Sequence, residues 1–346
     1  MRIALVAQPV ERVPPVRSGA VELIVSNLAE GLVERGHDVT LFASGDSRTR
    51  ARLVAPVRRA IQHDLAYDGL DWWPQSILIA QVLERQREFD IINSHAGYWF
   101  LPALHALTTP AVLTFHGYVH RKITTDILAY HRTAPLVAVS NYQRAATAAL
   151  DLNWVDTIYN GVATSDLTYA DQIGEYLLFL GRVVPVKRPD AAIRVALAAG
   201  IRIVVAGPVL DGDYFDHVIR PLLRNPGVEY VGEVVGEQRR SLLSGALGLI
   251  HTAEWESFGV SLIEAMASGT PVVCSDRASM PELVLDGVTG YVCASLNEMR
   301  DACWQLSGIS RAACRAHFLR NFTADTMVDR YVQCYERLAA TGSARV

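Results

Sequence analysis

Two carboxylates in the last third of the chain have a spacing that bears on chemistry. Glu256 and Glu264 lie in the stretch HTAEWESFGVSLIEAMASGTPVV (251–273), whose apolar and small residues follow a helical pattern. Glu256 precedes the predicted helix, and Glu264 lies five to six residues inside it, roughly 8 Å further along the axis at about 1.5 Å per residue. The two side chains are therefore not expected to form a close acid and base pair.

The start of this predicted helix is a candidate anion site. Ser257 is a favourable N-cap, Phe258 and Gly259 can begin the helix, and Gly269 ends it. The backbone N–H groups near Phe258, Gly259 and Val260 would have no partner inside the helix, and the positive end of the helix dipole lies there. With no Lys or Arg beside it in the sequence, this helix start is expected to bind phosphate.

Two basic residues could bind the same anion. Arg182 and Lys187 follow the apolar run YLLFLG in GRVVPVKRPD, where a loop could direct a guanidinium and an ammonium group at one diphosphate. Taken alone, the segment is more typical of a solvated loop before a helix. Phosphate-binding amides between Glu256 and Glu264 suit a ligand with hydroxyl groups on both sides of a diphosphate, and a nucleotide sugar is such a ligand.

Short β-branched runs alternate with amphipathic segments along the chain, which is the pattern of parallel sheets covered by helices. The clearest helix is AVELIVSNLAEGLVERGHDV, where apolar residues recur with a period of about 3.6 and Gly36 follows as a stop. Strands are predicted in the first half at 2–7, 38–43, 89–95, 111–116, 135–140 and 155–160. In the second half they are predicted at 175–181, 201–207, 228–234, 247–253, 271–276 and 290–295.

The repeated pattern predicts an α/β chain of two Rossmann-like, doubly wound domains, and 346 residues exceed what one core usually organises. The N-terminal domain is expected at 1–165 and the C-terminal domain at 166–322. The hinge is expected in the turn-rich stretch 160–174. A terminal helix at about 323–339 has no strand after it, and the segment 323–346 can pack back onto the first domain.

Ligands of open parallel sheets bind beyond the carboxyl ends of the strands, so the cleft between two facing sheets is the expected site. Several predicted strands end in small or polar residues. His95 and His116 end two strands of the first half. In the second half, the segment Gly232, Glu233 and Val234 ends a predicted strand and is expected to determine the choice of nucleotide base.

Missing motifs exclude several classes of enzyme. The chain has no G-x-x-x-x-G-K-[ST], no G-x-G-x-x-G after the first strand and no G-x-S-x-G. A P-loop NTPase, the usual dinucleotide fingerprint and a serine hydrolase are therefore disfavoured. His116 and His120 are four positions apart, but they lie at a strand end rather than on a helix, so no metal site and no bound cofactor are expected.

Composition places the chain among soluble globular proteins. The formal net charge of −4 does not call for nucleic acid as a partner. The five cysteines contain no C-x-x-C pair, and their odd number fits a reducing cytoplasmic compartment better than a disulfide framework. No signal peptide and no apolar stretch near 18 residues is recognisable, so a membrane-spanning segment is not expected and peripheral membrane contact is not favoured.

A local basic run stands apart from this acidic balance. Arg48, Arg50, Arg52, Arg58 and Arg59 cluster just after a predicted strand. Such a run could bind an anionic acceptor or the headgroups of a membrane surface. The favoured interpretation is a solvated loop, because isolated charge runs usually lie on the surface.

The stretch EWESFGVSLIEAMASGTPVV resembles the signature E-x-F-G-x-x-x-x-E-A-x-A-x-G-x-P-V of the retaining GT-B glycosyltransferases of family 4. Further motifs follow in the order of that family over nearly the whole chain: PPVRSGAVE with LAEGLVERGHDV, TFHG, VAVS, NGV, FLGRVVPVKRPD, VVAGP, VGEV and MPELVLDGVTGYV. The resemblance implies transfer of a sugar from a nucleotide-diphosphate sugar to a small-molecule or glycan acceptor. A UDP-sugar is the favoured donor, and GDP-mannose is an alternative.

The resemblance also implies a role for each matching residue. Glu264 would bind the donor ribose, and Glu256 would bind the hydroxyls of the transferred sugar. Arg182 and Lys187 would bind the diphosphate and stabilise the leaving group without a metal. His116 would touch the donor sugar near its anomeric carbon. The reaction would retain the anomeric configuration, with the departing phosphate accepting the acceptor's proton and with no nucleophile from the enzyme.

The acceptor pocket is expected in loops of the first domain, near Gly19 and the arginine run, and Gly19 is also a candidate donor-binding residue. His95, Tyr98 and Tyr118 are its candidate contacts, although His95 taken alone is better read as a structural residue at a strand end. Aromatic rings such as that of Trp99 would suit a sugar or a small aromatic acceptor.

The chain also departs from the usual residues of the family. It has Ala20 in place of a second glycine, Asn93 in place of the first histidine of a His-x-His motif, and Ala163 in place of an aspartate. His251 and Thr252 replace Pro and Ser. Two other functions stay open: a sugar-nucleotide epimerase or phosphorylase of the same architecture, and a non-catalytic nucleotide-sugar-binding protein. The oligomeric state is not predicted.

Overall fold

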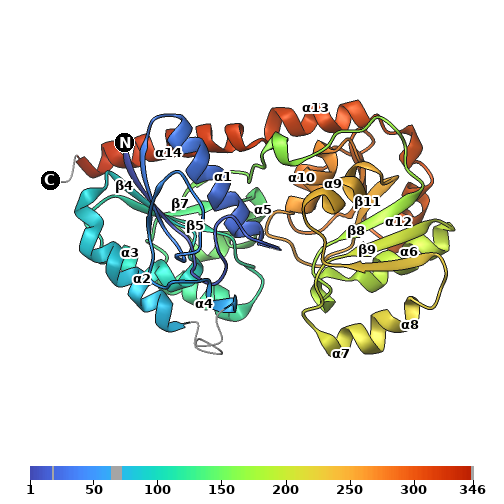
Figure 1. Ribbon diagram of the computed structural model, residues 1–346, viewed down its shortest axis with the longest axis horizontal. Helices are drawn as coiled ribbons and strands as arrows, with labels where there is room; N and C mark the ends of the chain where they lie inside the picture. Colours follow the sequence, from blue (N-terminus) through green and yellow to red (C-terminus); the bar gives the residue numbers. More distant parts are fainter. Residues whose placement is uncertain (18, 64–71, 344–346) are drawn as a thin grey trace. The chain divides into compact units, whose positions relative to one another are not determined.

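The computed structural model describes residues 1–17, 19–63 and 72–343, which form two compact α/β units (Figure 1). Unit 1 contains Met1–Gly161 and Ala324–Val346, and unit 2 contains Val162–Thr323. The chain therefore leaves unit 1 after Gly161, within the expected hinge, and returns to it at Ala324. Ser18 of the motif PPVRSGAVE and residues 344–346 of the expected terminal segment lie outside the described residues.

Unit 1 is built on a parallel sheet whose described strands have the order β3-β2-β1-β4-β5-β6-β7. The strands are β1 Arg2–Val6, β2 Asp38–Phe42, β3 Arg52–Val54, β4 Ile91–Ser94, β5 Ala111–Phe115, β6 Leu136–Ala138 and β7 Trp154–Thr157. All except β3 lie where the sequence pattern predicts a strand. The interpretation of residues 48–59 as a solvated loop is wrong for β3, which pairs with β2 at the edge of the sheet.

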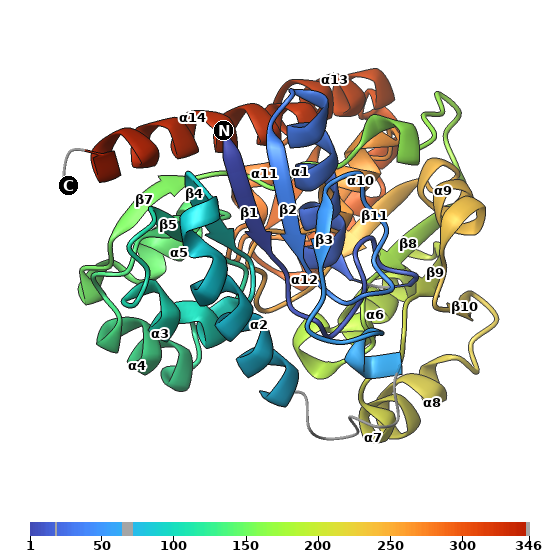
Figure 2. The same cartoon turned by 60° about the vertical axis from the view of Figure 1, so that its left-hand side comes forward.

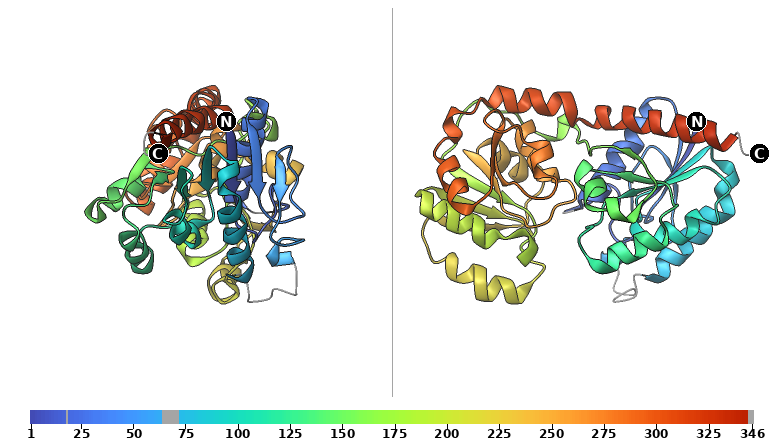
Figure 3. Two further views of the ribbon diagram at one scale, coloured as in Figure 1. Left: turned by 90° about the vertical axis from the view of Figure 1, so that its left-hand side faces the viewer. Right: turned by 180° about the vertical axis from the view of Figure 1, so that it is seen from behind.

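Helices cover both faces of this sheet (Figures 2 and 3). Their bounds are α1 Ala20–Glu34, α2 Trp72–Arg85, α3 Leu101–Leu104, α4 Lys122–Tyr130, α5 Asn141–Ala146 and α14 Ala324–Ser343. Successive side chains of a strand point to opposite faces, so each strand supplies both layers. Ala4, Ile92 and Leu113 pack with α2, α3 and α4 in one cluster, whereas α14 lies against α1 and β4.

A buried polar cluster fixes α14 to the sheet of unit 1. Asn93 Nδ2 donates to the hydroxyl of Tyr335 at 2.7 Å, and Thr114 Oγ1 donates to Asn93 Oδ1 at 3.1 Å. The hydroxyls of Thr114 and Tyr331 lie 3.1 Å apart. All four side chains are buried. Asn93, one of the departures from the family pattern, therefore serves to hold the terminal helix.

Unit 2 contains a second parallel sheet, with the order β10-β9-β8-β11-β12-β13 in its described residues. The strands are β8 Tyr176–Leu180, β9 Arg202–Ala206, β10 Val228–Gly232, β11 Gly248–His251, β12 Val272–Ser275 and β13 Gly290–Cys293. Each lies inside a predicted range, because most of these strands, such as β9 and β11, are largely buried and read as continuous apolar runs.

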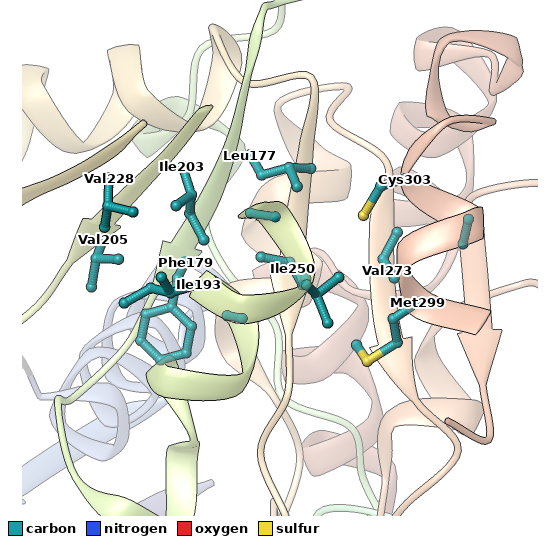
Figure 4. Packing of buried hydrophobic residues seen from close by; sticks show 14 of the residues in the cluster. Leu177, Phe179, Ile193, Ile203, Val205, Val228, Ile250, Val273, Met299 and Cys303 are labelled. Atoms are coloured by element: carbon teal, nitrogen blue, oxygen red, sulfur yellow. The ribbon is translucent and has the colours of Figure 1, made fainter. Parts of the chain in front are cut away.

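The helices of unit 2 are α6 Pro189–Ala199, α7 Gly212–Tyr214, α8 Arg220–Leu222, α9 Gly236–Ser244, α10 Val260–Ala267, α11 Met280–Leu283, α12 Leu296–Cys303 and α13 Arg311–Asn321. On one face of the sheet, Figure 4 shows Phe179, Ile203 and Ile250 packed against Ile193 of α6 and Met299 of α12. The helices α10 and α13 pack against each other. The sheet and these layers hold the carboxyl ends of the strands, and the loops after them, in fixed positions.

Replacing Tyr335 with Phe should lower the free energy of unfolding by about 1–3 kcal/mol, because the buried amide of Asn93 loses its acceptor. Tyr130→Phe is the matched control, since that ring is 85% exposed on α4 and should leave stability unchanged. Urea unfolding curves of both variants measure the difference. Equal stabilities for the two variants would contradict the role given to this hydrogen bond.

Candidate functional site

In both units the order of the strands reverses beside the first strand. The reversal lies between β1 and β4 in unit 1 and between β8 and β11 in unit 2. Loops that leave such neighbouring strands run in opposite directions, which opens a crevice at the carboxyl ends of the strands where ligands bind in α/β proteins. The candidate residues of unit 2 follow these two strands, with Lys187 after β8 and Glu256 after β11.

A buried charge cluster joins the two loops of unit 2. The ammonium group of Lys187 donates to Glu256 Oε2, and His251 Nε2 lies 3.4 Å from the same oxygen. The side chains of Lys187 and Glu256 are only 12% and 14% exposed. Among the described residues, Glu256 Oε1 has no hydrogen-bond partner. The carboxylate is therefore held by one oxygen, and its other oxygen can accept a hydrogen bond.

Main-chain contacts fix the geometry of this cluster. Thr252 Oγ1 donates to the carbonyl of Arg188 at 2.7 Å, and Glu254 N donates to the carbonyl of Val186 at 3.0 Å, so the loop after β11 is tied to the loop after β8. Ser279 Oγ lies within hydrogen-bonding distance of the carbonyls of Glu256 and Phe258, at 3.1 and 2.7 Å. Hydrogen bonds to main-chain carbonyls therefore hold the two loops that carry Lys187 and Glu256 against each other.

The protonation state of Glu256 follows from its neighbours. Burial alone would raise the pKa of its carboxyl group, but the charge of Lys187 and the hydrogen bond with His251 outweigh burial and hold the pKa far below its usual range. Glu256 is therefore an anion at every physiological pH. It can accept hydrogen bonds from hydroxyl groups, and it cannot serve as a general acid.

The second glutamate is held separately. Glu264, on α10, is 3% exposed and accepts a hydrogen bond from the guanidinium of Arg239 on α9 through Oε2. The expectation that Glu256 and Glu264 do not form one acid and base pair agrees with these separate cation partners. Each carboxylate is one half of its own ion pair.

The start of α10 differs from the sequence expectation. The prediction that Ser257 caps the helix and that Phe258 and Gly259 begin it is wrong: the helix begins at Val260, and the residue before it is Gly259 with φ 109°. A glycine is favoured here because other residues avoid positive φ. The side chain of Phe258 is buried beside Phe322 instead of continuing the helix.

The remaining donor-side candidates also lie at strand ends of unit 2. Arg182 follows β8 and is exposed, and Gly232 ends β10 with φ 74°. Glu233 is partly buried, and Val234 is 2% exposed, so Val234 contributes to packing. Among the described residues of unit 2, the hydrogen-bond and ion-pair partners of Lys187 and Glu256 do not include Gly232 or Val234.

In unit 1, the two candidate histidines contact each other. His95 Nδ1 and His116 Nε2 are 2.9 Å apart, and the rings are stacked with centroids 5.2 Å apart. His95 is 2% exposed, and its Nε2 is buried without a partner in the described part of the chain. Gln143 Nε2 donates to the carbonyls of Phe115 and Gly117, which fixes the turn that carries His116.

Both imidazoles are neutral at neutral pH. Burial lowers the pKa of His95 well below its usual value, with a further decrease from His116, and burial lowers the pKa of His116 to about 4. One ring must donate and the other accept in their shared hydrogen bond, so the tautomers of the two histidines are coupled. His95 thereby orients His116, in agreement with its expected structural role at a strand end.

The other acceptor-side candidates are spread over the loops of unit 1. Gly19 precedes α1, and a Cβ there would lie 2.6 Å from Pro15 Cβ, so only glycine fits. Ala20 is the first residue of α1. Tyr98 is 46% exposed beside Trp99, with ring centroids 5.9 Å apart. Tyr118 lies after β5, with its ring 5.6 Å from that of His120.

Sequence reasoning missed three residues that position the candidate site. His251 had been noted only as a departure from the family pattern, although a titratable residue at a strand end was a usable signal. Arg239 and Gln143 carried no local signal, because their roles depend on contacts with residues 25 and 28 positions away.

The structure contains no group of three or more His, Cys, Asp or Glu side chains that could hold a metal ion, within the residues that it describes. None of the described helices is long and apolar enough to cross a membrane.

Solved structures of similar architecture define the class of protein. A glycosyltransferase involved in avilamycin A biosynthesis, AviGT4, is 26% identical and superimposes with a TM-score of 0.76 over 98% of each chain. The Anabaena protein HepE, solved in complex with UDP and glucose, is 17% identical with a TM-score of 0.77 over 97% of this chain and 100% of its own. The fold is that of the GT-B glycosyltransferases.

Sequence comparison identifies the family. The pattern of Glycosyltransferase Family 4 matches residues 21–166, and that of Glycosyl transferases group 1 matches residues 170–302. The phosphatidyl-myo-inositol mannosyltransferase of Mycolicibacterium smegmatis is 25% identical over 99% of this chain and 95% of its own length. The chain belongs to the group 1 glycosyltransferases, and it is an enzyme of this type.

The paired histidines predict a pH dependence of stability. Because the folded chain keeps His116 neutral down to about pH 4 while the unfolded chain binds a proton near pH 6.5, stability should fall as the pH drops from about 6.5 towards 4. Above about pH 6.5 this contribution vanishes. His116→Asn should reduce the slope, measured by urea unfolding at several pH values. His217→Asn, which changes an exposed histidine, should keep the wild-type slope; an equal change in both variants would refute the assignment.

Proposed function

We propose that this enzyme is a retaining, metal-independent glycosyltransferase that moves a sugar from a nucleotide-diphosphate sugar to a small-molecule or glycan acceptor. The observation that carries the proposal is the buried cluster of Lys187, Glu256 and His251 at the point where the strand order of unit 2 reverses. It combines a cation with a permanently ionised carboxylate that keeps one oxygen available. These are the groups that a diphosphate and a sugar hydroxyl require.

The donor would bind in unit 2 along the loops after β8 and β11. Lys187 and Arg182 would neutralise the diphosphate, and the amide groups at the start of α10 would add hydrogen bonds to it. Glu256 would accept hydrogen bonds from the transferred sugar through Oε1. Glu264 would accept hydrogen bonds from the ribose, and Arg239 would hold its carboxylate in place.

UDP is the favoured nucleotide, and GDP-mannose is the alternative. Bound UDP in HepE supports UDP as the first choice to test, and the mannosyltransferase relative supports a mannose donor. The segment Gly232, Glu233 and Val234 would lie beside the base. Both donors share the diphosphate, so the roles of Lys187 and Arg182 are the same for either.

The chemical step would need no group of the enzyme as a nucleophile. An acceptor oxygen would attack the anomeric carbon on the face from which the diphosphate leaves, and the bond between that carbon and the phosphate oxygen would break. The departing phosphate would take the proton of the acceptor hydroxyl. Arg182 and Lys187 would stabilise the negative charge that develops, which is the task that a metal performs in other enzymes. His116 would contact the sugar near the anomeric carbon.

A panel of UDP-, GDP-, dTDP- and ADP-sugars tests the proposal by thermal shift and by release of nucleotide. One donor should raise the melting temperature, since it binds only the folded chain, and it should be turned over with an acceptor in the presence of EDTA. An epimerised sugar nucleotide as the product would support the epimerase alternative, and binding without turnover would support a binding protein. A loss of activity in EDTA that added metal restores would contradict the metal-free mechanism.

Glu264→Gln should weaken binding of the donor nucleotide by roughly 1.5–3 kcal/mol, because hydrogen bonds to a charged acceptor become hydrogen bonds to a neutral one. Isothermal titration calorimetry with UDP measures this change. Glu237→Gln is the control, since Glu237 is an exposed residue at the start of α9 that pairs with Arg240. An unchanged affinity in Glu264→Gln would remove this carboxylate from the donor site.

A further inference from the structure

The arginine run of unit 1 is divided into two groups by its contacts. Arg50 pairs with Glu30 and Glu34, and Arg52 pairs with Glu88. By contrast, Arg48, Arg58 and Arg59 are exposed, and no carboxylate of the described chain pairs with them. The first group is part of the structure of the edge strand. The second group has no structural role that its contacts explain.

The unpaired arginines lie in loops that main-chain hydrogen bonds hold together. The amide of Arg48 donates to the carbonyl of Val13 at 2.7 Å, and the amide of Gly45 donates to the carbonyl of Val57 at 2.9 Å. A Cβ on Gly45 would lie 2.9 Å from the carbonyl oxygen of Arg58, so these two loops are in direct contact. The loops follow β1, β2 and β3, which lie side by side (Figure 2). One end of the sheet therefore gathers the arginines of three loops.

Arg12, in the first of these loops, adds an observation of another kind. Its Nε atom is buried and has no hydrogen-bond partner in the described residues. A buried guanidinium N–H without an acceptor is unfavourable, and such groups in folded proteins normally have a partner. Arg12 as a whole is partly exposed, so a small shift of its guanidinium would let an anionic ligand supply the missing acceptor.

The charge balance of the loops points the same way. The segments 7–17, 43–51 and 55–63 contain six arginines, and their acidic residues are Glu11 and Asp46. Both acids already accept hydrogen bonds from neighbouring groups, Glu11 from the amide of Arg12 and Asp46 from the amide of Ala60. Glu22 of α1 lies near Glu11, and burial raises its pKa to about 7, so it adds only part of a negative charge.

We propose that Arg12, Arg48, Arg58 and Arg59 bind a phosphate or sulfate monoester that the acceptor carries. The proposal rests on the proposed function, because it names a property of the acceptor. Guanidinium groups bind such oxyanions through two parallel hydrogen bonds, which distinguishes these anions from a simple halide.

The sheet sets the distance between this anion and the reacting hydroxyl. Neighbouring strands are about 4.8 Å apart, so the end of β5, where His116 lies, is about 10 Å, 14 Å and 19 Å from the ends of β1, β2 and β3. An acceptor that reaches from the arginines to His116 would therefore carry its anionic group on the order of 10–19 Å away from the hydroxyl that is glycosylated. A neutral acceptor would leave the arginines without a partner.

The test compares glucose 6-phosphate with glucose, two probes that differ only in the phosphate. Calorimetric titrations use the full chain with saturating UDP, so that the proposed diphosphate site of unit 2 is occupied. Glucose 6-phosphate should bind and glucose should not. Arg48→Ala and the double variant Arg58→Ala/Arg59→Ala should each weaken binding by about tenfold or more. Arg12→Ala should weaken binding to a similar extent. If the Arg12→Ala variant fails to fold, Arg48→Ala and Arg58→Ala/Arg59→Ala decide the outcome.

Arg50→Ala and Arg52→Ala are matched controls, because they change arginines of the same run that are already paired. They should alter the affinity for glucose 6-phosphate by less than about twofold. Equal losses in Arg50→Ala and Arg48→Ala, or equal binding of both probes by the wild type, would overturn the proposal. Binding of UDP, measured alone, reports on the proposed function and should be the same in all these variants.

A second arm identifies the source of the anion. Vesicles of phosphatidylcholine with and without phosphatidic acid present the same monoester at a membrane surface. Cosedimentation that requires phosphatidic acid and Arg48 would assign the site to a lipid headgroup, and binding of glucose 6-phosphate alone would assign it to a free phosphate ester. If neither glucose 6-phosphate nor phosphatidic acid binds, the proposed anion site is wrong. The proposed glycosyltransferase activity is tested separately, by the panel of nucleotide sugars.

Discussion

The ion pair between Lys187 and Glu256 is the interaction on which the candidate donor site depends. It joins the loops that leave β8 and β11, and it does so under low exposure, where a lone ammonium or a lone carboxylate would be strongly disfavoured. Without Glu256, the buried ammonium group of Lys187 would lose its carboxylate, and without Lys187, Glu256 would keep only His251 as a side-chain partner among the described residues. The pair is thus an element of structure as well as of the site, because the same contact fixes the loops and keeps both charges in place for a ligand.

A comparable principle orders unit 1, although with neutral groups. His95 and His116 share one hydrogen bond, Gln143 holds the turn after β5, and the hydroxyls of α14 satisfy Asn93 and Thr114. Each buried polar group is placed by a partner from another part of the sequence. Unit 2 thus positions its candidate side chains with an ion pair, whereas unit 1 does so with hydrogen bonds between neutral groups. In both units these side chains lie at the carboxyl ends of parallel strands.

Strand positions and fold class could be predicted from the sequence, because buried parallel strands read as continuous apolar runs bounded by turn residues. The edge strand β3 was missed since three residues rich in arginine carry no such run. The start of α10 was misplaced because Ser257 is a good cap by type, whereas the path of the chain is decided by the positive φ of Gly259 and by the burial of Phe258. Arg239 could not be predicted, and the strand-end position of His251 indicated a site residue but not its partner, because which cation meets which carboxylate depends on the packing of separate loops.

The position of α14 in unit 1 has a consequence for the order in which the chain folds. Unit 2 is continuous in sequence, so a ribosome can release all of it before α14 has been made. Until α14 is synthesised, the sheet of unit 1 lacks the helix that contacts Asn93 and Thr114. Unit 1 therefore stays incomplete, with these polar side chains uncovered, while the rest of the chain is made. Unit 2 can thus be complete before the half of the enzyme that carries His116 is closed.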